Sequence, residues 1–172
     1  MKVINFSKWS TASAIPWKSV NFDHMTSRIP NILVLCTGNS CRSQIAHGFL
    51  EHLTRGQARI YSAGVEVHGV NPRAIVTMRE AGIDISGHTS NLVTEYIPIH
   101  FDHVITVCDN AKESCPVFPS QAKQHHHNFS DPAKATGSEE EILNAFRKVR
   151  EEIRAYCEAF VENELGIHQG AN

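Results

Sequence analysis

The sequence predicts an α/β protein built on an open, parallel four-stranded sheet with helices on both faces. Short apolar runs rich in β-branched residues alternate along the chain with longer segments of helical periodicity, a pattern typical of parallel strands joined by right-handed crossovers. The chain has 172 residues, of which 41% are hydrophobic, and this is enough for one hydrophobic core. We therefore expect a single domain.

The first predicted strand and the first predicted helix are separated by a short loop. Residues 29–35 form an apolar, β-branched run that reads as a buried strand and ends at Cys36. From Ser43 onward the spacing changes to a helical one, and Gly56 supplies the stop. The apolar residues that share one face of this helix are Ile45, Ala46, Phe49, Leu50 and Leu53.

A second strand and a second helix follow in the same order. The strand is predicted at residues 58–62. The helix opens with Asn71 as its N-cap and Pro72 at its first position, and Gly82 closes it. This repetition of strand, loop and helix supports the parallel sheet.

The last two strands and the last helix complete the pattern. Residues 101–107 are strongly β-branched, and a weaker strand is predicted within residues 123–129. The final helix begins with a capping box formed by Ser138 and Glu141, and its apolar stripe continues to Phe160. We therefore predict one domain over residues 29–165, while residues 1–28 show no sustained periodicity and form an N-terminal extension.

Charge and hydropathy exclude several classes of partner. The formal net charge is −2, with no long run of basic residues, so nucleic acid is not an expected partner. No apolar stretch approaches the roughly 20 residues that span a bilayer, and the N-terminus lacks the apolar segment of a secretory signal. We predict no membrane partner and a cytoplasmic location, where cysteines start as thiols.

The loop after the first strand has the composition of an oxyanion site. A short loop that enters a helix directs backbone N–H groups at one point, and the helix dipole adds positive potential there. Arg42 can bind two oxygens of a tetrahedral oxyanion at once, and the same field would lower the pKa of the Cys36 thiol. Gly38 permits the tight turn, and Ser43 could donate a hydrogen bond to the thiolate. The predicted substrate-binding residues are Thr37, Gly38, Asn39, Ser40, Cys41 and Arg42.

The segment from Val34 to Gln44 resembles the nucleophile loop of the low-molecular-weight tyrosine phosphatases and of the thioredoxin-linked arsenate reductases related to them. The resemblance implies a flavodoxin-like, three-layer fold of the low-molecular-weight phosphatase type, with Cys36 as the nucleophile. Gln44 favours the reductase branch, since the phosphatases usually have proline there. The resemblance also includes Asp131-Pro132, which is similar to the loop of the family's general acid.

The resemblance extends to a second pair of cysteines. The patch from Val107 to Ala111 is similar to the redox segment of those reductases, and Cys115 follows Cys108 after six residues. The resemblance implies attack on arsenate by Cys36, a Cys36–Cys108 disulfide, and a final Cys108–Cys115 disulfide that thioredoxin reduces. Arsenate and thioredoxin are therefore the expected partners, and no tightly bound cofactor is expected.

Three alternatives stay open. A phosphotyrosine phosphatase would use Cys36, Arg42 and Asp131 and leave the second pair of cysteines idle. A thiol-based metal or oxyanion binding protein would not turn over, and a zinc site could combine Cys108 and Cys115 with the histidine run 125–127, although six intervening residues fit such a site poorly. We therefore expect no metal site.

Two further expectations concern a cation and the remaining thiols. Some relatives resemble a potassium-dependent type with acidic residues where this chain has His47 and Asn91, which argues against a potassium site. Cys157, on the final helix, is expected to serve packing, and Cys41 is expected to be a buried loop thiol.

Overall fold

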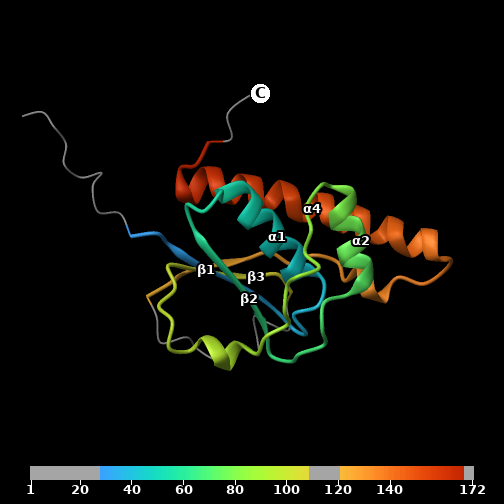
Figure 1. Cartoon of the computed structure of the whole chain (residues 1–172), viewed down its shortest axis with the longest axis horizontal. Helices are drawn as coiled ribbons and strands as arrows, with labels where there is room; N and C mark the ends of the chain where they lie inside the picture. Colours follow the sequence, from blue (N-terminus) through green and yellow to red (C-terminus); the bar gives the residue numbers. More distant parts are fainter. Residues whose placement is uncertain (1–27, 109–120, 169–172) are drawn as a thin grey trace, which may run out of the picture.

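The protein folds around one parallel sheet of four strands. The computed structural model describes residues 28–108 and 121–168, and the sheet has the spatial order β2-β1-β3-β4 (Figure 1). Its strands are β1 (Asn31–Cys36), β2 (Arg59–Gly64), β3 (His103–Thr106) and β4 (Lys123–His126). All three strand pairings are parallel, so the predicted fold class is confirmed.

The described helices begin where the sequence places their caps. They are α1 (Arg42–Thr54), α2 (Pro72–Glu80) and α4 (Glu139–Leu165), together with the 3₁₀ helices η3 (Val93–Tyr96) and η4 (Pro132–Lys134). Asn71 caps α2 by accepting a hydrogen bond from the backbone N–H of Arg73 at 2.9 Å. At the start of α4, Glu141 Oε2 accepts from the backbone N–H of Ser138 at 2.7 Å, which closes the predicted capping box.

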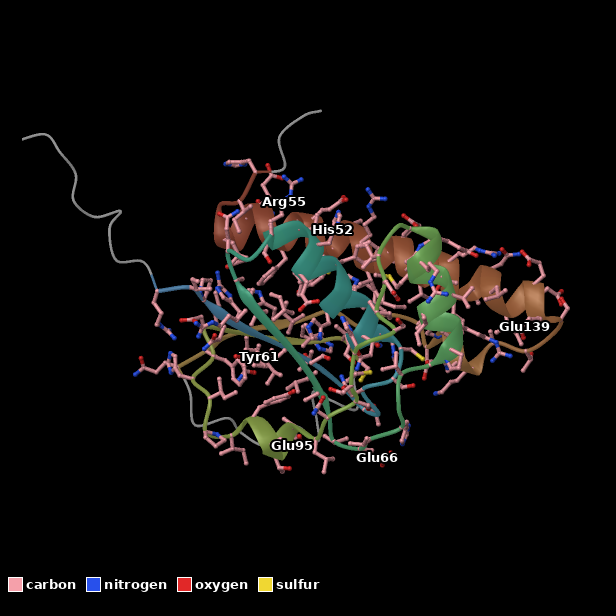
Figure 2. The ribbon with its side chains drawn as sticks, in the orientation of Figure 1. His52, Arg55, Tyr61, Glu66, Glu95 and Glu139 are labelled. Carbon is pink, nitrogen blue, oxygen red and sulfur yellow. The ribbon has the colours of Figure 1, made fainter. Side chains whose placement is uncertain are left out.

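The two faces of the sheet are covered by different elements. Figure 1 shows α1 and α4 on one side of the strands, with α2 beside α4, and η3 on the other side. On the η3 side, the ring of Tyr61, which is labelled in Figure 2, packs against two other aromatic rings. Its centroid lies 5.5 Å from that of Tyr96 and 5.4 Å from that of Phe101. Among the described residues, the second face is therefore covered by aromatic side chains and a 3₁₀ helix. The sequence analysis did not predict this helix, because an element this short has no clear periodicity.

Every residue of β1 is buried, as a central strand covered on both faces requires. Leu35 of β1 pairs with Thr106 of β3. Cys36 and Cys108 come just after these two residues, so both lie at the same edge of the sheet. None of the described helices is long and apolar enough to cross a membrane, and the 27 residues of α4 alternate between a buried stripe and charged residues.

Two of the sequence predictions fall largely or wholly outside the described residues. The first is the N-terminal extension predicted over residues 1–28, because Arg28 is the first residue that the structure describes. Cys115 and the rest of the segment that follows Cys108 are the other. Both stay predictions.

Candidate active site

Three neighbouring strands end at one pocket. Cys36 ends β1, Cys108 follows β3, and Asp131 follows β4, so three segments far apart in the sequence meet at the carboxyl edge of the sheet. They line a cavity of about 570 Å³ together with Arg42 and the tip of the loop after β1. The structure thus brings together the nucleophile, the anion-binding arginine, the second thiol and the carboxylate that the sequence singled out.

The loop between β1 and α1 is held by hydrogen bonds on its outer side. The backbone N–H groups of Glu66, His68 and Asn71 donate to the carbonyls of Thr37, Gly38 and Ser40 at 2.9, 3.1 and 3.0 Å. Because the peptide bonds are trans, a carbonyl turned outward directs the next N–H to the opposite side. The loop therefore presents backbone N–H groups to its interior, where an anion can accept from them.

The turn in this loop is made by Asn39 and not, as expected, by Gly38. Asn39 has a φ of 45°, in the left-handed region, whereas Gly38 is absent from the positive-φ residues. Asn39 is fully buried, and its Oδ1 accepts hydrogen bonds from Gln44 Nε2 at 2.9 Å and from the backbone N–H of Asn91 at 3.0 Å. At Gly38 a Cβ would lie 2.3 Å from the His68 ring, so a side chain there would displace this ring, which is 56% exposed.

Arg42 joins the loop to the carboxylate across the pocket. Its Nη1 donates to the carbonyl of Phe129 at 3.0 Å, and its Nη2 lies 3.2 Å from Asp131 Oδ2. The Arg42 side chain is 11% exposed, so the guanidinium is positioned by the protein and faces the cavity. Asp131 also caps η4 by accepting from the backbone N–H of Ala133 at 3.2 Å, which fixes the direction of its carboxylate.

Cys36 and Cys108 line the same pocket, and the nearness of Cys108 changes the expected acidity of Cys36. The contact with Cys108, followed by burial, raises the pKa of the Cys36 thiol, while Arg42 and the backbone N–H of Thr37 lower it. The net direction is upward, which corrects the expectation that the loop alone would lower this pKa. The physical reason is that loss of the Cys36 proton ends its interaction with Cys108 and brings a negative charge close to that second sulfur. Cys108 Sγ also lies 3.4 Å from Thr37 Oγ1.

Ser43 and Cys41 support the loop from behind. Ser43 is fully buried, and its Oγ accepts a hydrogen bond from Asn39 Nδ2 at 3.0 Å. The hydroxyl hydrogen of Ser43 is not used in this bond. That it is donated to the Cys36 thiolate stays a prediction. Cys41 is buried as expected, and burial raises the pKa of its thiol to about 11.

Two ionisable side chains that line the pocket escaped the sequence analysis. His68 covers the loop at Gly38, and Lys134 lines the pocket from η4. Lys134 follows the Asp131-Pro132 dipeptide by two residues, and this nearness to a loop already identified was the only available signal. For His68 there was none, because its segment between β2 and α2 has no periodicity and carries no motif.

The histidine run does not join Cys108 in the described part of the molecule. His125 and His126 lie on β4, where His125 Nε2 is 3.1 Å from His103 Nδ1 and His126 Nδ1 is 2.8 Å from Thr106 Oγ1. Neither group of possible metal ligands among the described residues contains Cys108. Two of the three histidines therefore belong to β4, and His127 directly follows the strand.

Fold and pocket together define a parallel α/β protein with a cysteine-and-arginine oxyanion loop. The chain belongs to the low molecular weight phosphotyrosine protein phosphatase family, whose model matches residues 31–168. This match covers the described domain, and the resemblance of the loop from Val34 to Gln44 is confirmed at the level of the family.

The chain is also similar to individual members that carry names. It is 47% identical over 131 residues to an arsenate reductase of Shouchella clausii, which covers 76% of this chain and 94% of that protein. It is 45% identical over 131 residues to an arsenate reductase of Bacillus subtilis, with the same coverage. The sequence similarity therefore falls on the reductase branch of the family.

Solved structures show the same fold. An arsenate reductase in the phosphate binding state superposes with a TM-score of 0.66 at 30% identity, covering 81% of this chain and 99% of that one. A low molecular weight protein tyrosine phosphatase from T. tengcongensis superposes with a TM-score of 0.66 at 25% identity, covering 77% of this chain and 98% of that one. The fold is thus common to both branches, and the choice between them depends on the site.

Proposed function

We propose that this protein reduces arsenate to arsenite through a relay of Cys36, Cys108 and Cys115, and that thioredoxin regenerates it. The observation that carries the proposal is that the thiols of Cys36 and Cys108 lie in the same oxyanion pocket, close enough for Cys108 to raise the pKa of Cys36. Phosphate ester hydrolysis needs one thiolate, whereas reduction of arsenic(V) needs two electrons, which two thiols supply by forming a disulfide. A second thiol in contact with the nucleophile suits the reduction. The names of the relatives in Shouchella clausii and Bacillus subtilis support the same choice.

The first step forms a bond between sulfur and arsenic. The Cys36 thiolate attacks the arsenic of arsenate while Arg42 and the loop N–H groups hold the remaining oxygens. Asp131 lies across the pocket, 3.2 Å from Arg42, and donates a proton to the departing oxygen, which leaves as water. The product of this step is a Cys36–arsenic(V) adduct.

The second step transfers the electrons. The Cys108 thiolate attacks the sulfur of Cys36, the sulfur–arsenic bond breaks, and its electron pair goes to arsenic, which leaves as arsenite. A Cys36–Cys108 disulfide remains. Cys115 then attacks Cys108 and frees Cys36 as a thiolate. Thioredoxin reduces the resulting Cys108–Cys115 disulfide, so the two electrons come from that dithiol protein. A reducing compartment such as the cytoplasm fits this cycle.

The lining of the pocket favours a small inorganic oxyanion. The lining residues that the structure describes are mostly polar or charged, including Ser40, Asn128 and Lys134. Phe129 is the one Phe, Tyr or Trp among the described lining residues, and it is 3% exposed and packs against His127 and Tyr156. An aryl phosphate gains from a ring that stacks against its own, and a ring as buried as Phe129 can offer little surface for this.

A phosphatase activity is the second candidate. Cys36, Arg42 and Asp131 form the set that hydrolysis of a phosphate monoester requires, and they lie around the same cavity. Such an activity would use the first step alone, with water cleaving the Cys36 adduct. We expect it as a side reaction of the reduced protein.

The deciding experiment compares the two reactions on the same preparation. Oxidation of NADPH is followed with arsenate, thioredoxin and thioredoxin reductase, and release of nitrophenol from an aryl phosphate is followed in parallel. The proposal expects continuous arsenate-dependent turnover with a much higher kcat/KM than that for the aryl phosphate. Turnover of the aryl phosphate alone would overturn the reductase and leave the phosphatase.

A Cys115→Ser variant tests the relay itself, because Cys115 acts only after arsenite has left. This variant should keep hydrolysis of the aryl phosphate but stop after a single arsenate turnover, with a Cys36–Cys108 disulfide detectable by mass spectrometry. Cys157→Ser is the matched control, since that thiol lies in the core and should leave both reactions in place. Multiple thioredoxin-driven turnovers by Cys115→Ser would contradict the relay.

A further inference from the structure

Behind the oxyanion loop, two imidazoles and a carboxylate converge on one point. His47 and Glu51 lie one turn apart on α1, so they share a face of the helix, and His88 reaches them from the segment after α2. Glu51 Oε1 is 3.2 Å from His47 Nε2, and Glu51 Oε2 is 3.4 Å from His88 Nε2. The three ligand atoms all lie within 4.8 Å of one another.

The other nitrogen of each imidazole is already engaged. His88 Nδ1 is 3.0 Å from Gln44 Oε1, an atom that can only accept, so Nδ1 carries the proton and Nε2 presents a lone pair when the ring is neutral. His47 Nδ1 is 2.9 Å from Ser62 Oγ. Metal-binding histidines are commonly oriented in this way, with the second N–H donated to a fixed acceptor.

When His88 is neutral, its Nε2 lone pair faces the Glu51 carboxylate, so a positive charge between them is favoured. The Ser62 hydroxyl can donate to His47 Nδ1 or accept from it, so His47 Nε2 can also present a lone pair. A proton on the His88 ring or a metal cation can supply the positive charge. A single divalent cation satisfies all three groups at once. We propose that His47, Glu51 and His88 bind one Zn²⁺-class transition metal ion, a site that the sequence analysis did not expect.

The spacing is compatible with one ion after a small rearrangement. Two ligands on a tetrahedral ion with bonds of about 2.0–2.1 Å lie about 3.3–3.4 Å apart. The Glu51 oxygens lie 3.2 and 3.4 Å from the imidazoles, but each distance belongs to a different oxygen, and the three ligand atoms lie within 4.8 Å of one another. The side chains must therefore draw together around the ion. Two nitrogen ligands also disfavour potassium, which prefers oxygen. Water takes the fourth position, because Glu51 is half exposed and the site opens into a cavity of about 240 Å³.

A second cluster of the same composition is less suitable. His103 and His125 lie beside Glu164, but their nearest nitrogens, Nδ1 and Nε2, are 3.1 Å apart and already form a hydrogen bond with each other. The ammonium of Lys123 lies 2.5 Å from Glu164 Oε2 and supplies the positive charge that the carboxylate needs. In this cluster the histidines bond to each other and Lys123 pairs with Glu164, so these ligand atoms already have partners. We use it as a comparison for the first cluster.

The proposed site is linked to the oxyanion loop through one side chain. Gln44 accepts from His88 through Oε1, and its Nε2 donates to Asn39 Oδ1 at 2.9 Å and to the Asn39 carbonyl at 3.1 Å. Asn39 is the left-handed residue of the loop. An ion that fixes His88 therefore also restrains the turn that shapes the oxyanion site.

The experiment titrates the reduced full-length protein with Co²⁺ and then displaces it with Zn²⁺. Cobalt bound by nitrogen and oxygen gives visible d–d bands without the near-ultraviolet charge-transfer band of a thiolate ligand, which separates this site from the cysteines. We expect one equivalent of such cobalt, and a higher Tm with Zn²⁺. Glu51→Gln and His88→Gln should each weaken binding by at least about 100-fold, since even loss of an outer hydrogen-bond partner costs 10–100-fold.

Two variants serve as controls. His52→Gln changes an exposed histidine on the same helix (Figure 2), and His103→Gln disrupts the comparison cluster. Both should bind cobalt as the wild type does. The proposal is wrong if the wild type shows no nitrogen-ligated cobalt, if Glu51→Gln binds it unchanged, or if only His103→Gln loses it. Glu51→Gln decides the matter should His88→Gln fail to fold, because the Glu51 side chain is 53% exposed.

Discussion

Two pairs of thiols in the described part of this protein are equally buried but differ in what surrounds them. Cys36 and Cys108 are 4% and 3% exposed, and Cys41 and Cys157 are 6% and 0% exposed. Burial therefore does not distinguish the pairs. Cys36 and Cys108 lie at the ends of neighbouring strands, and Cys108 acts directly on the acidity of Cys36, whereas the thiol of Cys41, which lines the same cavity, donates to Ser40 Oγ at 3.9 Å. We therefore expect the partners of a thiol, and not its exposure, to decide its reactivity in this protein.

Cys157 shows what the same residue does without such partners. It lies on α4 against α1, where its thiol donates to the carbonyl of Ala46 at 3.9 Å. Burial raises the pKa of this thiol, and no cation is among the causes that act on it. Cys157 behaves as a small hydrophobic residue that joins two helices.

The largest expected effect is that of Cys36→Ser. A serine hydroxyl is not ionised at neutral pH, so both arsenate reduction and aryl phosphate hydrolysis should fall by at least about 10⁴-fold, as for other lost nucleophiles. Steady-state rates with both substrates measure this, and an unchanged far-ultraviolet circular dichroism spectrum is the control. Near wild-type turnover in either assay would remove Cys36 from the role of nucleophile.

Arg42→Lys should have the next largest effect. Lysine keeps the charge but loses the fork that binds two oxygens, and it also leaves the carbonyl of Phe129 without its hydrogen bond. We expect kcat/KM for arsenate to fall by about 10²–10³-fold, the usual cost of losing a donor to an oxyanion. If kcat/KM fell by less than tenfold, the positive charge alone, and not the two-oxygen contact of the guanidinium, would be responsible for binding.

Cys108→Ala sharpens the comparison within the reactive pair. The interaction with Cys108 is the largest cause of the raised pKa of Cys36, so its removal should lower that pKa. Alkylation of Cys36 by iodoacetamide follows the thiolate, and its pH profile should therefore move to lower pH in the variant. Labelling is quantified by peptide mass spectrometry, with Cys41→Ala as the matched control. A profile that moves to higher pH, or stays unchanged, would show that Cys108 does not hold the proton of Cys36.

Cys157→Ala tests the packing member of the comparison. Removing a buried sulfur leaves a small cavity between α1 and α4, which should lower the free energy of unfolding by about 1–2 kcal/mol. Urea unfolding followed by circular dichroism measures the change. Arsenate turnover at a temperature well below Tm should stay within a factor of two of the wild type. A loss of turnover without a loss of stability would contradict the packing role.

The sequence predicted most of the fold and the centre of the site because both depend on local signals. Strand ends, a capping box and a spaced cysteine and arginine are written in adjacent residues, and the elements begin within a few residues of the predicted positions. Cys36 and Cys108 could be brought together by topology alone, since parallel strands end at the same edge.

The features that sequence did not reveal depend on long-range contacts. The role of Gly38 depends on where His68 lies, and the left-handed turn at Asn39 depends on donors from Gln44 and Asn91. The upward pKa of Cys36 depends on the interaction with a residue 72 positions away in the chain. None of these contacts leaves a periodic or motif-like trace in the sequence.

The smallest expected effect belongs to Lys134, a pocket residue that has no thiol chemistry. It is exposed on η4 and lines the cavity, so its ammonium adds positive potential where the anion enters. Exposed charges interact weakly because water and salt screen them, and the contribution is about 1 kcal/mol or less. Lys134→Met should therefore raise KM for arsenate by about fivefold or less and leave kcat unchanged, since the lysine acts before the sulfur–arsenic bond forms. The effect should shrink as salt is added, which a structural defect would not do. A fall in kcat at saturating arsenate would instead place Lys134 in the transition state, alongside Arg42.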